Sequence, residues 1–537
     1  MCHVKEIVCD RGRMDICSVQ RLCLEEKREG SDVIPKSLKI HPPKWPKDAV
    51  CLIRGAQNLQ DDSQLRNTDN IPWQNGCDVA GALNQKYQGY VVSVSSLTSL
   101  AIRKPKQEIV VDLEHNAEIF YEPGDAFYFV VPNVREETTG NFARPYNEWF
   151  LLMDGYYSLT KILLSFKSSQ SIQCSRAHSV IDGISGGSGP KISYNCEISN
   201  YNKNAALPPY IPEISTLRYI FTWCLDIRRS PGRPLLRVLA ECTENECQKR
   251  RILELCSAQG VEEFTKFVRQ AGLSLVDFLL NFPSCRPTVE RLIELLPRLL
   301  PRPYSVSCIR ELWGKRMRFI FSLAHFNAID GRRFHRFGLS SGWLATLKEK
   351  QQILMFLKES SRFRLPPPVY SSFDLTCVPL IMICTGTGLA PFLSFLQKLD
   401  FLKAGKYRVR RELYFGIRNI DDDCIYYRDI MRFVDENILS HVSLCESQPC
   451  NGSANKRYVQ DVLQERGREI SDILVQKNKD ESHPALIFVC GSSKEMSRSV
   501  ADAFLYIFSK FLNKNKDEAE SCLKELRKSD QYIEDIW

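Results

Sequence analysis

The sequence contains a glycine-rich turn of the kind that binds phosphate groups. Residues 384–392 read Cys-Thr-Gly-Thr-Gly-Leu-Ala-Pro-Phe; they follow an apolar run, Val378–Cys384, and open a predicted helix, Ala390–Leu402. Glycines let backbone amides approach a pyrophosphate, and the start of a helix adds a favourable dipole. A Gly-x-Gly pair alone is also typical of a plain tight turn, but the strand before it and the helix after it favour dinucleotide binding.

Three other short segments have suitable chemistry. In Arg302–Ser305, arginine suits a pyrophosphate, tyrosine offers a flat face to a ring, and serine offers a small hydroxyl. Phe488–Gly491 ends a predicted strand, where open α/β sheets bind ligands. Tyr532–Trp537 ends the chain with an aromatic residue close to two acidic ones. Each also has a plain interpretation, respectively an edge strand, a buried packing cysteine and a docked tail.

The elements that must position these segments change character along the chain. Short strands are predicted at Tyr90–Val94, Glu108–Leu113 and Ala126–Val131, which favours a small barrel. Helical periodicity dominates between Trp149 and Leu300, interrupted by a glycine-rich polar stretch at Ser165–Ala206 that predicts a flexible insertion. After three prolines at 366–368, strands and helices alternate, as in a doubly wound parallel sheet.

Composition excludes several classes of protein. The 537 residues are 44% hydrophobic and 25% charged with a net charge of +8, without a dense basic run, so we expect no nucleic-acid partner. The first residues lack a signal-peptide core and no run of about 18 apolar residues occurs, so we expect no membrane contact. The 21 cysteines are scattered without a Cys-x-x-Cys pair, which predicts no metal site and a cytoplasmic location.

Taken together, the four segments occur in the order and spacing of the diflavin reductase family, which the chain resembles from about Gly89 to Trp537. Tyr121–Asp125 resembles the barrel signature of that family, and Gly338–Leu344 resembles its FAD-pyrophosphate loop. The stretches most similar to the members that serve methionine synthase are Phe221–Ile227, Phe282–Cys285, Pro301–Ser305, Gly342–Leu344 and Tyr532–Trp537.

The resemblance implies a fold. We expect a multidomain α+β protein whose antiparallel FAD-binding β-barrel comprises residues 86–140 and 299–364. A helical connecting domain at 141–298, with the flexible insertion near 165–206, would separate the two parts. A doubly wound α/β NADP-binding domain would follow at 365–537, and residues 1–85 would be a poorly ordered extension.

It also implies roles for residues at the flavin. Arg302 would bind the FAD pyrophosphate, Tyr304 would stack on one face of the isoalloxazine, and Ser305 would hydrogen-bond near N5. The FAD diphosphate would be held by Gly338, Leu339, Ser340 and Ser341.

Other residues would serve the coenzyme by the same resemblance. Gly386, Thr387 and Gly388 would hold the NADP pyrophosphate. Cys490 and Asp535 would surround the nicotinamide and, with Ser305, assist hydride transfer, while Trp537 would cover the second flavin face and move aside. The predicted contacts around the 2′-phosphate are Arg418, Lys456, Tyr458 and Gln460.

Three departures from the family pattern qualify this interpretation. Glu446 follows Cys445 where the family has an arginine that grips the 2′-phosphate, and Ser492 replaces the usual aspartate after Cys-Gly. Residues 1–85 are too short for the family's flavodoxin-like domain, so FAD and NADPH are the expected cofactors and FMN is not expected in this chain.

The expected activity is hydride transfer from NADPH to FAD, with electrons passing to methionine synthase, for reductive reactivation of that cobalamin-dependent enzyme, or to a separate FMN-containing protein. Two alternatives remain at this point. One is a reductase of the haem monooxygenase type, and the other is a truncated, non-catalytic product that binds cofactor or partner.

Overall fold

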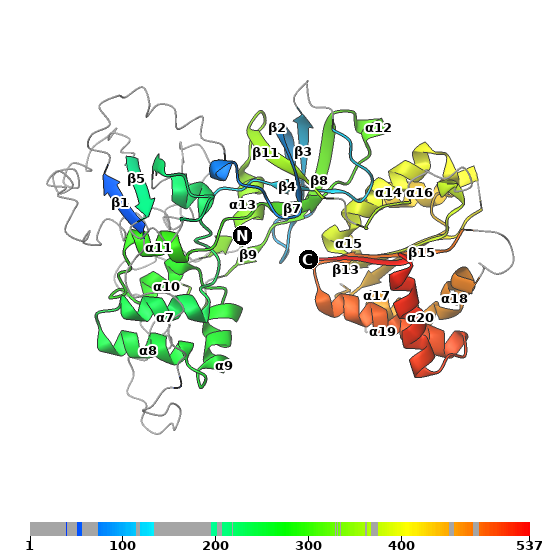
Figure 1. Cartoon of the computed structure of the whole chain (residues 1–537). Coiled ribbons are helices and arrows are strands. Elements are labelled where there is room, and N and C mark those ends of the chain that lie inside the picture. Colours follow the sequence, from blue (N-terminus) through cyan, green and yellow to red (C-terminus); the bar gives the residue numbers. More distant parts are fainter. Residues whose placement is uncertain are drawn as a thin grey trace, which may run out of the picture. The chain divides into compact units, whose positions relative to one another are not determined.

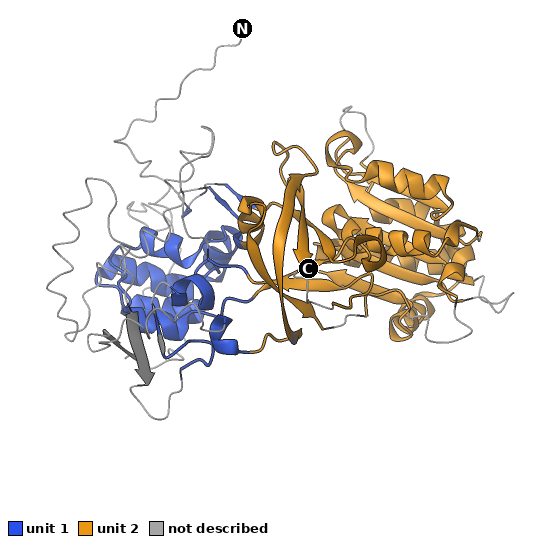
Figure 2. Cartoon of the chain, turned by 90° about the horizontal axis from the view of Figure 1, so that it is seen from above, with its two compact units in different colours: residues 1–77, 131–300, 325–339 blue, residues 78–130, 301–324, 340–537 orange. Residues whose placement is uncertain are grey.

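The computed structural model groups the chain into two compact units (Figures 1 and 2). Unit 1 draws on residues 1–77, 131–300 and 325–339, and unit 2 on 78–130, 301–324 and 340–537. The structure describes Lys39 and residues 51–55, 73–113, 119–133, 195–200, 207–216, 219–327, 329, 331–332, 335–359, 362–366, 374–406, 408–449, 456–475 and 483–537.

Unit 1 is mainly helical. Its helices bury one continuous apolar cluster that includes Leu239, Leu255 and Phe278. The helices begin where polar side chains satisfy free backbone amides: Asn245 accepts from Gln248 N at 3.0 Å, and Ser274 forms a capping box with Asp277. The helical segments are η2 (Trp73–Gly76), η3 (Ile220–Cys224), α7 (Arg233–Glu241), α8 (Glu246–Cys256), α9 (Val261–Phe264), η4 (Thr265–Gln270), α10 (Leu275–Asn281) and α11 (Val289–Leu295).

Unit 1 also contains two small antiparallel sheets. Strands β1 (Cys51–Gly55), β5 (Asn195–Asn200) and β6 (Ile214–Thr216) form one, and the hairpin β9 (His325–Phe326) and β10 (Arg336–Phe337) forms the other. Strand β5 lies within the stretch predicted to be a flexible insertion, and the structure describes no other part of 165–206. Strand β5 pairs with β1 on one side and β6 on the other, and the flexibility of the insertion stays a prediction.

Unit 2 contains an antiparallel six-stranded sheet of order β7-β4-β11-β2-β3-β8. A bridge between Val306 and Phe319 brings the first and last strands together, so the sheet is a nearly closed barrel. Inward-facing aromatic rings fill it, with Phe129 edge-on to Phe319 at 4.9 Å. The strands are β2 (Ala82–Ser96), β3 (Lys106–Leu113), β4 (Ala126–Phe129), β7 (Arg302–Ser305), β8 (Arg316–Ser322) and β11 (Gln352–Lys358), accompanied by α12 (Arg310–Trp313) and α13 (Leu339–Thr346).

The rest of unit 2 is a five-stranded parallel sheet of order β14-β13-β12-β15-β16. Side chains alternate between two cores: Met382 and Cys384 face α14 (Leu389–Phe401) and α16 (Tyr427–Asp435), whereas Ile381 and Ile383 face helices on the other side. The strands are β12 (Leu380–Thr385), β13 (Arg411–Ile417), β14 (His441–Glu446), β15 (Leu486–Gly491) and β16 (Tyr532–Ile536). The remaining helical segments are η5 (Leu375–Cys377), η6 (Gly386–Gly388), η7 (Ala404–Lys406), α15 (Ile420–Asp423), α17 (Val459–Glu465), α18 (Gly467–Val475), α19 (Lys494–Phe511) and α20 (Lys516–Lys528).

These two parts confirm the predicted fold class of a β-barrel with helices and a doubly wound α/β domain. Among the described helices, none has the length and hydrophobicity needed to cross a lipid bilayer.

Candidate functional site

The glycine-rich turn lies where the strand order of the parallel sheet reverses. The chain adds β13 and β14 on one side of β12 and then returns to add β15 and β16 on the other. Gly386–Gly388 leads directly from β12 into α14, and Gly388 packs against the backbone of Cys490 on β15. Ligands of open α/β sheets bind outside such a switch point, at the carboxyl ends of the strands.

Close backbone packing explains why this turn uses glycine. A side chain at Gly388 would place its Cβ 2.3 Å from the carbonyl oxygen of Cys490, and Gly386 has a φ of +56° that side chains disfavour. Gly416 and Gly491 lie on either side of Thr385, and a Cβ on them would meet its side chain at 2.8 and 2.7 Å. The edge is therefore formed by backbone, which gives a phosphate chain direct access to amide groups.

Cys490 and Asp535 lie side by side at the same edge. The two residues pair across β15 and β16, and Cys384 pairs with Cys490 on its other side. Cys490 is fully buried, and burial followed by the Asp535 carboxylate raises the pKa of its thiol well above the ordinary value, so the thiol is neutral. Burial also raises the pKa of Asp535, and the nearby Lys358 cation opposes that rise.

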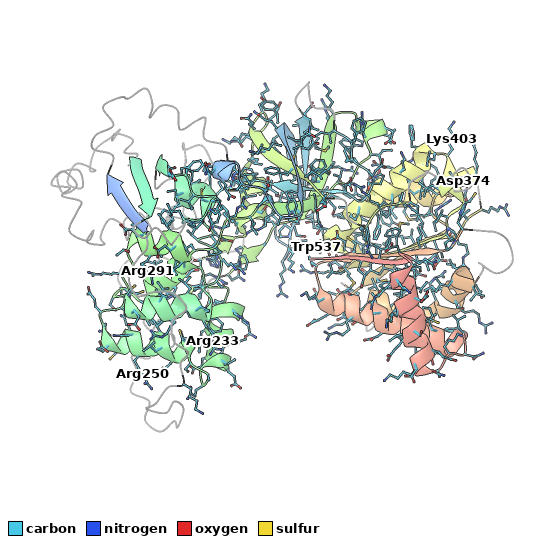
Figure 3. The ribbon with its side chains drawn as sticks, viewed as in Figure 1. Arg233, Arg250, Arg291, Asp374, Lys403 and Trp537 are labelled. Atoms are coloured by element: carbon cyan, nitrogen blue, oxygen red, sulfur yellow. The ribbon has the colours of Figure 1, made fainter. Side chains whose placement is uncertain are left out.

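Trp537 ends the chain at this edge. Its backbone amide donates to the carbonyl of Gly491 at 3.2 Å, and the residue is 54% exposed (Figure 3). Residues Tyr532–Ile536 therefore form the fifth strand of the sheet, and Trp537 directly follows it.

On the barrel side, the structure joins two of the predicted flavin motifs. The hydroxyl of Tyr304 on β7 lies 2.7 Å from that of Ser340 on α13, and the Tyr304 ring is edge-on to Phe129 at 5.4 Å. Burial raises the pKa of Tyr304, so its hydroxyl stays protonated at neutral pH. Ser341 accepts a hydrogen bond from Ala324 N at 3.0 Å, and Ser305 pairs with Ala126.

The segment that resembles a diphosphate loop is the start of a helix. Helix α13 begins at Leu339, so Ser340 and Ser341 lie in its first turn and Gly338 directly precedes it. The first amides of a helix lack partners within the helix, which suits them to an anion. Arg302 begins β7, the strand that carries Tyr304 and Ser305.

The predicted 2′-phosphate contacts lie beyond β13 and β14. Arg418 follows β13, and Glu446 ends β14 in register with Ile417. The Glu446 carboxylate accepts a hydrogen bond from Ile420 N at 2.7 Å, so it is already engaged. Lys456 and Tyr458 are exposed, and Gln460 lies in the first turn of α17. The neighbouring Arg457 is exposed and paired with Glu465.

Two lysines belong to this region although sequence reasoning missed them. Lys106 on β3 is 4% exposed and bonded to Asp423, and its Cε lies 3.5 Å from where a Cβ on Gly386 would be. Lys358 on β11 acts on the pKa of Asp535. The only sequence signal near Lys106 is the basic stretch Arg103–Lys106, which is equally typical of a solvated turn.

Comparisons with known proteins agree with this geometry. The family model described as "FAD binding domain" matches residues 187–343, and "Oxidoreductase NAD-binding domain" matches residues 382–502. Methionine synthase reductase of Caenorhabditis elegans is 38% identical over 518 residues, which cover 91% of this chain and 68% of that protein. The chain belongs to the methionine synthase reductase family.

Two other relatives help to define this membership. Methionine synthase reductase of Homo sapiens is 33% identical over 451 residues, covering 80% of this chain and 58% of that protein. NADPH–cytochrome P450 reductase of Dictyostelium discoideum is 30% identical over 322 residues, covering 60% and 45%. The chain thus spans 58–68% of the length of these two methionine synthase reductases. The two domain matches confirm FAD and a nicotinamide nucleotide as the cofactors of this family member.

Proposed function

We propose that this chain catalyses hydride transfer from NADPH to FAD and supplies electrons for the reductive reactivation of cobalamin-dependent methionine synthase. The packing of Gly388 on the backbone of Cys490 is the main support, because it forms a dinucleotide turn directly beside the residues predicted to face the nicotinamide. The names of the C. elegans and human relatives support methionine synthase as the final acceptor.

The described residues fit both cofactors. Gly386, Thr387 and Gly388 would hold the NADP pyrophosphate through their backbone amides, in a turn whose Gly388 packs directly on the backbone of Cys490. The buried Lys106 beside this turn would add a positive charge, although burial lowers its pKa and Asp423 already binds it. On the barrel, Tyr304 would present its ring to the flavin while its bond to Ser340 fixes that ring relative to the helix start that holds the diphosphate.

Three groups would act near the reacting atoms. When bound, FAD accepts a hydride from the nicotinamide and releases electrons singly. The neutral Cys490 thiol would fill the floor of the site without adding charge. Asp535 would supply a negative charge where the nicotinamide ring becomes cationic, and the Lys358 cation would favour the ionised form of this carboxyl by opposing the rise of its pKa. The exposed Trp537 would leave the flavin face when the coenzyme arrives, and Ser305 would donate a hydrogen bond near N5.

Electrons would leave for methionine synthase, either directly or through a separate FMN-containing protein. A reducing, cytoplasmic setting accords with the free thiols of thirteen cysteines whose side chains the structure describes.

Anaerobic stopped-flow mixing with NADPH tests the proposal. The purified chain, loaded with FAD, should lose flavin absorbance near 450 nm, and acid release should yield FAD and not FMN. Ferricyanide should be reduced, while a cytochrome that needs FMN should be reduced poorly until an FMN protein is added. A chain that binds FAD yet shows no bleaching with NADPH would instead be the non-catalytic binding product.

A further inference from the structure

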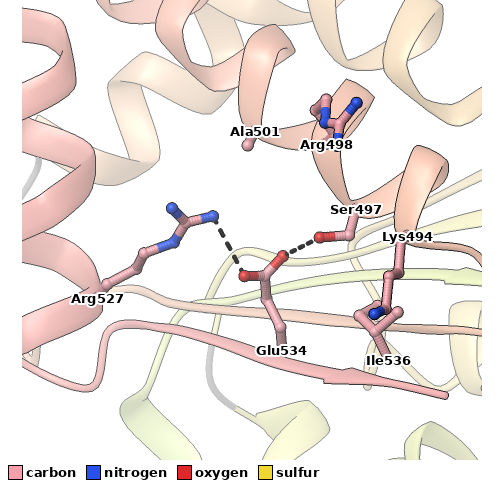
Figure 4. A pocket seen from close by; sticks show the side chains of 7 residues that line it. All are labelled: Lys494, Ser497, Arg498, Ala501, Arg527, Glu534 and Ile536. Atoms are coloured by element: carbon pink, nitrogen blue, oxygen red, sulfur yellow. Dashed lines mark hydrogen bonds and ion pairs between the residues drawn. The ribbon is translucent and has the colours of Figure 1, made fainter. Parts of the chain in front are cut away.

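A shallow pocket lies between helices α19 and α20 and strand β16 (Figure 4). Its volume is about 560 Å³, which falls within the range of small-molecule sites, roughly 300–1,000 Å³. The residues that line it are Lys494, Ser497, Arg498 and Ala501 of α19, Arg527 of α20, and Glu534 and Ile536 of β16. None of them has a role in the hydride transfer proposed above.

The pocket carries a surplus of positive charge. Three cations and one carboxylate line it, which leaves a surplus of two. Glu534 is held in place, since Ser497 Oγ donates to it at 2.6 Å and Arg527 pairs with it at 3.2 Å (Figure 4). Within the part of the chain that the structure describes, Lys494 and Arg498 have no carboxylate partner.

This pocket is separate from the coenzyme edge although both use β16. Glu534 and Ile536 share a face of the strand with Tyr532, which packs against α19. Asp535 points to the opposite face, with Ile533, whose side chain belongs to the other core. A ligand in the pocket would therefore touch the back of the strand whose front carries Asp535.

We propose that this pocket binds the phosphate group of a small phosphorylated molecule through Lys494, Arg498 and Arg527. A phosphate monoester carries about −1.5 to −2 charges at neutral pH, which matches the surplus, and its oxygens suit the fork of arginine. A ligand with a single carboxylate would fit less well, because one carboxylate compensates only one cation, as Glu534 does for Arg527. The apolar side chains of Ala501 and Ile536 leave a place for the organic part.

Calorimetric titration of the full chain at low ionic strength tests the proposal, with saturating NADP⁺ present so that the coenzyme site is occupied. Inorganic phosphate, pyrophosphate and glycerol 3-phosphate are the probes, and tighter binding of the ester than of inorganic phosphate identifies a monoester site. We expect one saturable site, weakened roughly 2- to 30-fold by the double substitution Lys494→Ala with Arg498→Ala, because exposed pairs contribute about 0.2–1 kcal/mol each.

Two matched variants make the test decisive. Lys524→Ala with Lys528→Ala removes the same charge from exposed positions of α20 outside the pocket and should leave binding unchanged. Glu534→Gln should tighten binding, because it releases Arg527 and removes the competing carboxylate. The absence of a saturable site, equal losses in the two double variants, or weaker binding by Glu534→Gln would each overturn the proposal.

Discussion

The carboxyl edge of the parallel sheet has two regions of different construction. At β12 and β15 the edge is backbone: Gly388 rests on Cys490, and Gly491 packs against Thr385. At β13 and β14 it is made of charged side chains, among them Arg418 and Glu446. The first region has no room for an added atom, whereas the second can exchange one side chain for another.

This difference predicts how each region responds to substitution. In a close-packed region the cost of a change is steric and abrupt, because neither backbone can move without displacing its strand. In an exposed charged region each side chain adds a small, screened contribution, so changes should be graded. The coenzyme's phosphates would thus be located by the first region, and its 2′-phosphate would be distinguished by the second.

Gly388→Ala should have the largest effect. Its Cβ would lie 2.3 Å from the Cys490 carbonyl oxygen, so we expect a loss of about 1–3 kcal/mol in the free energy of unfolding. Binding of NADP⁺ should weaken by roughly 100-fold if that strain is concentrated at the turn. Urea unfolding and calorimetry would measure both quantities.

Gly232→Ala serves as the control, because a Cβ there meets only Pro234, at an ordinary 3.6 Å. It should leave coenzyme binding unchanged. Equal coenzyme binding by the parent and Gly388→Ala would contradict the view that this region tolerates no added atom.

Asp535→Asn should have the second largest effect, on rate and not on binding. Removing the charge beside the nicotinamide should slow flavin reduction by about 10- to 100-fold in stopped-flow experiments. Coenzyme affinity should change little, since the backbone turn is intact. A weaker affinity with an unchanged rate would assign Asp535 to binding instead.

The same variant also tests how the stability of the fold depends on pH. Because burial raises the pKa of Asp535 in the folded chain above its ordinary value of 3.8, ionising it costs stability. The protonated Asp535 contributes its full stabilisation of the fold at a pH below 3.8, and this contribution is lost as the pH rises through the pKa of Asp535 in the folded state. Asp535→Asn should therefore unfold at a higher temperature than the parent at pH 8, and the difference should shrink toward pH 4. A difference that does not vary with pH would contradict the raised pKa.

On the flavin side, Tyr304→Phe and Ser340→Ala test whether one hydrogen bond joins the two motifs. Each substitution removes the same 2.7 Å contact, so each should lower FAD affinity by about 1 kcal/mol, or roughly fivefold. The double variant should lose little more than either single variant, and equilibrium dialysis of FAD would measure this coupling. Additive losses would show that the two residues act separately.

The sequence predicted most of the parallel sheet because its strands are apolar and its helices are regular. The predicted helix Ala390–Leu402 matches α14 to within one residue at each end, and the strand Val378–Cys384 overlaps β12. Strand β16 was not predicted, since Tyr532–Trp537 mixes apolar and acidic residues and becomes a strand only by pairing with β15. The helical start at Leu339 was also missed, because glycine and serine disfavour helix interiors.

For a similar physical reason, only some residues of the candidate site could be predicted from the sequence. Sequence motifs identified Gly388, Tyr304 and Ser340, which depend on local turns and strand ends. Lys106 could not be found in this way, because its burial depends on Asp423, which is 317 residues away. The roles assigned to individual site residues remain predictions that the variants described here would test.

The smallest expected effect concerns Glu446 and the choice of coenzyme. Its carboxylate would repel the 2′-phosphate of NADPH, but it is bonded to Ile420 N, and two cations, Arg418 after β13 and Lys456 after β14, would attract that phosphate. We therefore expect NADPH to be preferred over NADH by a modest margin. Glu446→Arg should widen that margin by roughly 2- to 30-fold, since exposed charge pairs contribute about 0.2–1 kcal/mol and two such contributions change together.

Stopped-flow reduction with both coenzymes at low and high salt would measure that ratio. Glu446→Gln is the matched variant, because it removes the charge while an amide oxygen can still accept from Ile420 N, and it should produce about half of the effect in free energy. Salt should reduce the effect of both substitutions, because the charges are exposed to solvent. Two results would show that this charged region does not select the coenzyme: faster reduction of the parent by NADH than by NADPH, or an unchanged ratio in Glu446→Arg. The charged region would then differ from the backbone turn in its structure but not in its function.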